Sequence, residues 1–148
     1  MGGWYWIGVS VGLGTGAGVL LVGVVTGLLG ATRRAIVAAA LIAALSGVAI
    51  GHAIDSFEPG GWANVFAGVL GGISGTLAAA QIVGGALRRG GTRGGTAAIV
   101  AVSGIFLGAL ALVPGLGYVL AIGLPAVAAR IRRRLPDRHE GLRTLAKD

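Results

Sequence analysis

The charged residues divide the chain into long apolar stretches. Between residues 1 and 129 they occur only at positions 33–34, 55–58 and 88–93, so four stretches carry no charge: residues 1–32, 35–54, 59–87 and 94–129. A helix needs about 20 predominantly apolar residues to cross the hydrocarbon core of a bilayer. Each stretch meets that length, and the pattern therefore predicts an all-α fold, a polytopic transmembrane helical bundle.

The last uncharged stretch is long enough for two crossings. As one helix, residues 94–129 would extend about 50 Å, whereas the hydrocarbon core is about 30 Å thick. The sequence Pro114-Gly115-Leu116-Gly117 interrupts it, because proline cannot continue a helical hydrogen-bond ladder and glycine accepts turn conformations. We therefore favour five spans over four, with Pro125 kinking the last. They form a transmembrane domain of residues 1–135, with spans at about 4–31, 35–53, 62–87, 97–113 and 118–135, followed by a basic cytoplasmic tail of residues 136–148.

The arginines predict the orientation of the bundle. Cytoplasmic connections of membrane proteins carry an excess of Lys and Arg. The second connection contains Asp55 and Glu58 but no Lys or Arg. The first and third contain Arg33, Arg34, Arg88, Arg89 and Arg93. The expected location is the inner (plasma) membrane, multi-pass, with the amino terminus outside and the carboxyl terminus in the cytoplasm. The excess of Ala, Gly, Val and Arg, with a single Lys, suggests a bacterial source with a GC-rich genome.

Composition supports the membrane assignment and narrows the chemistry. Hydrophobic residues make up 55% of the chain and charged residues only 11%, against about 25% charged residues in soluble domains. The absence of cysteine excludes disulfides, thiolate metal sites and cysteine nucleophiles. Because the basic residues flank apolar spans, the net charge of +7 predicts contact with the bilayer and its anionic lipid headgroups rather than with nucleic acid. The headgroup candidates are Arg130, Arg132, Arg133 and Arg134.

Glycines at four-residue spacing indicate close packing between helices in this sequence. The chain has 30 glycines, many of them four residues apart. Such spacing keeps small residues near one face of a helix, where they allow the close backbone approach that stabilises helix pairs in lipid. We expect these ridges to pack tightly, either against each other or across a subunit boundary. The packing candidates are Gly8, Gly12 and Gly16 in the first span and Gly68, Gly72 and Gly84 in the third.

Few side chains suggest chemistry. Gln81 is the one strongly polar side chain expected deep in a span, and with Thr76, Ser74 and Thr15 it could line a polar path for a solute. The alternative is an interhelical bond for Gln81 and bonds from the hydroxyls to their own helix backbone. No catalytic motif is present, so we expect neither an enzyme nor a bound cofactor.

Three polar residues gather at the expected outer end of the second span. His52, Asp55 and Glu58 are spaced to share one side of a helical turn and could form a cation-binding or pH-responsive mouth. Two or three ligands make a poor metal site. We therefore expect solvated loop residues here and no metal.

Two functions from different classes fit these features. In the first, which we favour, the glycine ridges assemble a homo-oligomer that forms a passive channel, or a transport component, for an ion or small solute. The absence of ionisable residues within the spans favours passive conduction over coupled pumping. In the second, the same ridges bind another membrane protein, and the chain is a structural or assembly subunit that transports nothing.

Overall fold

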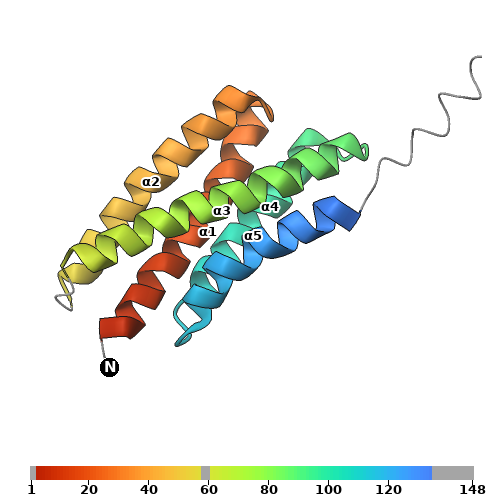
Figure 1. Ribbon diagram of the computed structural model, residues 1–148. Coiled ribbons are helices and arrows are strands. Elements are labelled where there is room, and N and C mark those ends of the chain that lie inside the picture. The colour runs from red at the N-terminus through yellow and green to blue at the C-terminus, as the bar shows by residue number, and fades with distance from the viewer. Residues whose placement is uncertain (1–2, 58–60, 135–148) are drawn as a thin grey trace, which may run out of the picture.

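The computed structural model describes residues 3–57 and 61–134 and consists of helices joined by short turns. The five helices are α1 (Gly3–Leu29), α2 (Arg33–Asp55), α3 (Trp62–Arg88), α4 (Arg93–Leu110) and α5 (Leu116–Arg134), shown in Figure 1. The first four are long and apolar enough to cross a membrane, and α5 has a shorter apolar part, Leu116–Ile131. The expectation of an all-α polytopic transmembrane bundle is therefore confirmed.

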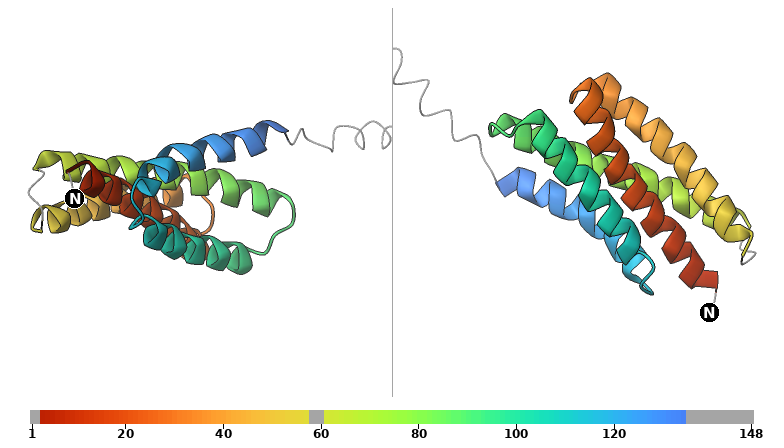
Figure 2. Two further views of the ribbon diagram at one scale, coloured as in Figure 1. Left: turned by 90° about the horizontal axis from the view of Figure 1, so that it is seen from below. Right: turned by 180° about the vertical axis from the view of Figure 1, so that it is seen from behind.

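The bundle is organised around α1. This helix contacts each of the other four, whereas α2 and α4 lie on opposite sides of it (Figures 1 and 2). α3 runs beside α1 and also contacts α2 and α5. Helix α4 begins at Arg93 rather than near residue 97 and ends at Leu110 rather than near residue 113, because Thr92 caps its amino end and the turn before Pro114 starts early.

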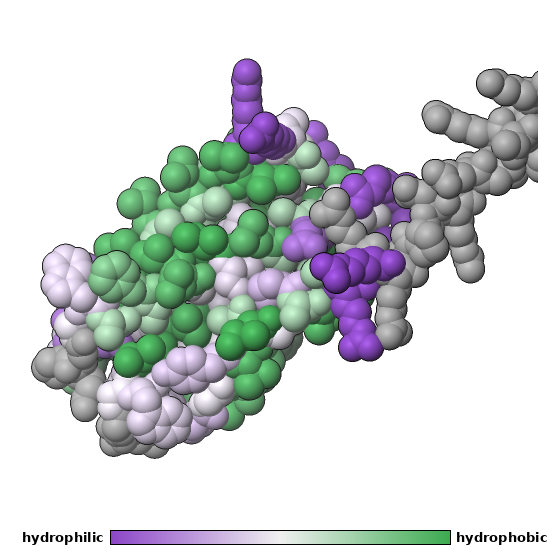
Figure 3. Space-filling view, viewed as in Figure 1, coloured by the Kyte–Doolittle hydropathy of each residue, from purple (hydrophilic) through white to green (hydrophobic). Residues whose placement is uncertain are grey.

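Small side chains fill the inside of the bundle and large ones cover the outside. The largest fully buried side chains include Val22, Val83, Thr15 and Thr76, with no Leu, Ile or aromatic residue among those that the structure describes. Many leucine, isoleucine and phenylalanine side chains are exposed instead, and the face in Figure 3 is largely hydrophobic between the ends of the helices. A soluble protein buries such side chains. The reverse arrangement suits a lipid environment, where close packing between helices needs small residues.

The described arginines and most of the aromatic residues lie at opposite ends of the bundle. The turns after α1 and α3 share one end with the carboxyl end of α5, and there the described arginines gather (Figures 1 and 3). The other end holds the amino terminus, the connection between α2 and α3, and the turn between α4 and α5. Two tyrosines tie this end together: Tyr5 donates its hydroxyl to the carbonyl oxygen of Leu112, and Tyr118 donates to that of Trp4.

Proline within α5 is compensated by a neighbouring helix. α5 continues through Pro125, which has no N–H to donate to the carbonyl oxygen of Ala121, four residues earlier. The hydroxyl of Ser74 on α3 donates to that same oxygen. A freed carbonyl inside a membrane is costly unless it regains a partner, and hydroxyls of adjacent helices commonly supply one. This bond joins α5 to α3, two helices that are also in contact with each other.

Candidate functional site

The glycines of α1 and α3 bring the two backbones into direct contact. A Cβ on Gly71 would overlap the carbonyl oxygen of Val11 and lie 2.9 Å from the nitrogen of Thr15. A Cβ on Gly18 would overlap the carbonyl oxygen of Gly72 and lie 2.8 Å from the nitrogen of Thr76. Space too small for a methyl group is too small for water, so no path runs between these helices at this contact.

Helix α2 packs against the same glycine ridge of α3 and also contacts α1. Additional Cβ atoms on Gly14 of α1 and on Gly47 of α2 would both overlap the carbonyl oxygen of Gly68, and one on Gly72 would lie 2.6 Å from the carbonyl oxygen of Ala43. The ridge that contains Gly68 and Gly72 is therefore used twice, by α1 and by α2. Both contacts lie within one chain.

A second glycine face of α1 receives α4 and α5. A Cβ on Gly16 would lie 2.6 Å from the nitrogen of Gly108, and one on Gly12 would lie 2.7 Å from the Cα of Gly117. Gly8 is packed under the ring of Tyr118. Gly84 differs from the other packing candidates, since only the side chain of Arg88 in its own helix approaches it.

The hydroxyl groups proposed for a polar path do not converge. Thr15 and Thr76 are buried, and each donates to a carbonyl oxygen of its own helix, Val11 and Gly72 respectively, at 2.8 Å. Ser74 bonds to α5 as described above. Such bonds satisfy the hydroxyls locally and leave them little capacity to bind a solute.

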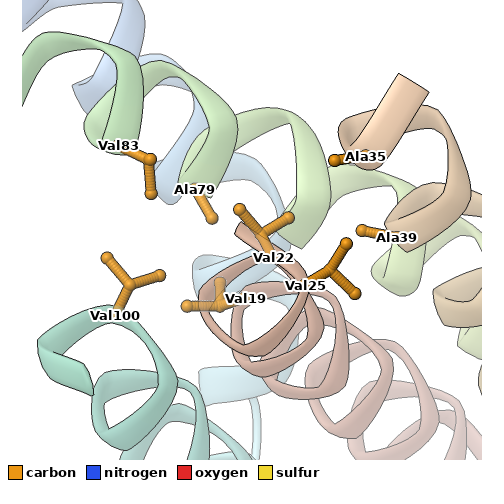
Figure 4. Close-up of a cluster of buried hydrophobic side chains, with 8 residues drawn as sticks. All are labelled: Val19, Val22, Val25, Ala35, Ala39, Ala79, Val83 and Val100. Atoms are coloured by element: carbon orange, nitrogen blue, oxygen red, sulfur yellow. The ribbon is translucent and has the colours of Figure 1, made fainter. Parts of the chain in front are cut away.

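Apolar side chains close the bundle toward its arginine-rich end. Eight buried residues from α1 to α4 point toward one another in Figure 4, and the cluster consists of Val19, Val22, Val25, Ala35, Ala39, Ala79, Val83 and Val100. Leu87 and Leu107 pack against it. Thr26 is also buried at this level, and its hydroxyl donates to the carbonyl oxygen of Val22 at 2.6 Å.

Gln81 lies on the outer side of α3, outside this cluster. Its amide nitrogen donates to the carbonyl oxygen of Leu77 at 3.3 Å, one turn earlier in the same helix. A hollow of about 390 Å³ opens beside it on α3, lined by Leu77, Ala80, Gln81, Gly84 and Arg88. The only glutamine of the expected path thus faces an outer surface hollow.

The expected outer mouth is a closed connection between helices. Asp55 accepts a hydrogen bond from the backbone nitrogen of Gly61 at 2.6 Å, which helps to close the turn from α2 to α3. The ring of His52 meets that of Trp62 edge-on, with centroids 6.4 Å apart. Glu58 lies outside the described residues. Among those residues no group of three His, Asp or Glu side chains could hold a metal ion.

Two further polar residues are buried, Ser10 and Asn64, and the sequence had not indicated Asn64 as a candidate. Asn64 is 1% exposed and Ser10 is fully buried, and in the described part of the chain neither side chain has a hydrogen-bond partner. Ser10 precedes Gly14 by four residues and Asn64 precedes Gly68 by four, so the register of the α1–α3 contact places the two opposite each other. The four-residue spacing between Asn64 and Gly68 is the sequence feature that could have indicated a buried position for Asn64.

Arg93 also has a structural role that its position in the sequence did not indicate. As the first residue of α4, it donates from Nε to the carbonyl oxygen of Thr26 at 3.1 Å and from Nη2 to that of Leu28. These carbonyls belong to the last turn of α1, where helical partners run out. Arg130 and Arg133 are exposed near the end of α5, and Arg132 and Arg134 belong to the same helix.

Comparison of the chain with protein-family models, with curated proteins and with solved structures gives no match.

Proposed function

We propose that this chain is a non-conducting structural or assembly subunit of a membrane, which acts by binding other membrane components at its outer faces. The observation that carries the proposal is the closed interior. Glycine contacts bring α1 against α3 backbone to backbone, and an apolar cluster fills the space toward the arginine-rich end. These contacts support a single chain that does not conduct ions or polar solutes through its own interior.

The binding surfaces of such a subunit differ from those expected from the sequence. The glycine ridges of α1 and α3 are occupied by helices of the same chain. Contacts with a partner would instead use the large apolar side chains on the outer faces, such as Leu70 on α3, Leu45 on α2 and Ile99 on α4. In this proposal the ridges stabilise the subunit and the outer faces select the partner.

A passive channel remains the second candidate, and one feature favours it. Gln81 and Arg88 line a hollow on the outer side of α3, so copies of the chain facing one another across α3 would place polar groups along a shared surface. A pore of this kind would lie between subunits. It would need an oligomer whose contacts do not involve the glycine ridges.

Single-cysteine variants can separate the two candidates, because the natural chain has no cysteine to interfere. A photo-crosslinker attached at Leu45→Cys, Leu70→Cys or Ile99→Cys would be activated in the native membrane. The assembly proposal predicts one discrete heavier adduct with a different protein, confined to one of the three faces. Adducts between copies of the chain, confined to Leu70→Cys, would support the intersubunit channel, and the absence of any adduct at all three positions would contradict the assembly proposal.

A further inference from the structure

The hollow on α3 changes character along its length. The part of the hollow nearer the middle of α3 is apolar and is formed by Leu77 and Ala80. At the end of α3, near the arginine-rich end of the bundle, the hollow is lined by Arg88. Gln81 lies between them. This order of apolar, hydrogen-bonding and cationic groups follows the order of acyl chain, ester and phosphate in a phospholipid. The volume of the hollow is about 390 Å³, and it is open toward the outside of the bundle.

Arg88 supplies the positive charge. Its guanidinium folds back over Gly84, where a Cβ would lie 3.9 Å from Nη1. In the described part of the chain no carboxylate or carbonyl oxygen bonds to this guanidinium. Its planar set of donors suits the oxygens of a phosphate group. The missing side chain at Gly84 leaves the space in which such a group would meet it.

Gln81 supplies hydrogen bonding below the charge. One N–H of its carboxamide is used by Leu77, which leaves a second N–H and the carbonyl oxygen. Polar groups that face hydrocarbon without a partner are costly. An ester oxygen of a glycerolipid would accept the second N–H at this depth.

We propose that the hollow binds one anionic phospholipid, with its phosphate on Arg88, an ester group at Gln81 and an acyl chain along Leu77. Basic pockets between membrane helices bind anionic headgroups, and in this hollow α3 alone supplies the basic, polar and apolar groups. The site differs from a general attraction of the basic tail for lipid, because it depends on one arginine and on the space above Gly84. It is independent of whether the chain also binds a protein partner.

Arg89 provides a charge-matched control. Arg89 is the next residue in the sequence, and its side chain is exposed, as that of Arg88 is. Its guanidinium lies beside Gly85 and does not line the hollow. Arg88→Gln and Arg89→Gln each remove one positive charge from the same end of the same bundle. Only the first removes a group that lines the hollow.

The test is native mass spectrometry of the full chain released from nanodiscs that contain equal parts of phosphatidylcholine and phosphatidylglycerol. We expect the unmodified chain and Arg89→Gln to retain one phosphatidylglycerol. Arg88→Gln should retain about tenfold less, because a charge-assisted bond is lost, and Gly84→Leu should do the same by filling the hollow. Excess inorganic phosphate should not displace the lipid.

Three results would overturn the site. These are equal losses in Arg88→Gln and Arg89→Gln, equal retention of phosphatidylcholine, and displacement of the lipid by inorganic phosphate, which would indicate a phosphate site without lipid. Circular dichroism checks the helical content of every variant. If Gly84→Leu fails to fold, the comparison of the two arginine variants still decides the question.

Discussion

At the residue scale, the value of a glycine in this protein depends on what faces it. Gly75 of α3 lies against α1, where a Cβ would overlap the carbonyl oxygen of Thr15 and lie 3.0 Å from its Cα. Gly123 of α5 is also helical, yet nothing within 4 Å would meet its Cβ. The sequence makes the two look alike. Only the packing shows that one is required for contact and the other is not.

The Gly75→Ala variant should therefore lose stability, by about 1–3 kcal/mol, because the added methyl group forces two backbones apart. Gly123→Ala should keep its stability or gain up to about 1 kcal/mol from the better helix propensity of alanine. Thermal unfolding in the same detergent measures both. Equal effects of the two substitutions would show that α1 and α3 do not touch as described.

At the scale of elements, a proline and a serine from different helices form one unit. Ser74 donates to the carbonyl oxygen of Ala121, which Pro125 leaves without a partner. If Pro125 is replaced by alanine, the new N–H can bond that oxygen within α5. The hydroxyl of Ser74 would then contribute less to the free energy of unfolding.

A double-mutant cycle with Ser74→Ala and Pro125→Ala tests this coupling. Ser74→Ala should destabilise the natural chain by about 0.6 kcal/mol, the mean for interhelical bonds in a membrane protein, and should cost less in the Pro125→Ala background. The free energy of unfolding in detergent is the readout. Strict additivity of the two substitutions would mean that the serine hydroxyl does not compensate the proline.

The contact between Arg93 and the end of α1 is another property of elements. Two carbonyls of the last turn of α1 accept bonds from this side chain, whereas Arg33, the first residue of α2, makes no such bond among the described residues. Arg93→Gln should destabilise the chain by about 1 kcal/mol, and Arg33→Gln should have little effect. Denaturant titration of both variants checks this difference. A loss in Arg33→Gln as large as that in Arg93→Gln would point to net charge instead of a helix cap.

At the scale of the whole molecule, the charge pattern was sufficient to predict the helices but not their partners. The uncharged stretches and the sequence at Pro114-Gly115 predicted five helices in nearly the observed places. The glycine spacing indicated close packing, yet small residues suit a contact within a chain as well as one between chains. Which of these applies depends on how α3 lies against α1 and α2, a long-range property that spacing within one helix does not contain.

The polar residues were harder to interpret for the same reason. The hydroxyl of Ser74 donates a hydrogen bond to α5, and the side chain of Gln81 lines a hollow on the outer surface. Asn64 is more buried than either of them. Each outcome depends on the rotation of a helix and on its neighbours. Asn64 was overlooked because it lies near the start of α3, where a polar residue is ordinarily taken as part of a turn.

We propose above that one chain forms a closed bundle that conducts nothing. The decisive experiment measures the flux of potassium and of a small neutral solute from liposomes that contain the purified chain. Gln81→Leu is measured in parallel, and gramicidin is added last to show that the vesicles report potassium leakage. We expect vesicles with either chain, correctly inserted, to stay as tight as protein-free vesicles. Leakage through the natural chain that Gln81→Leu abolishes would contradict it and place a conducting path along α3.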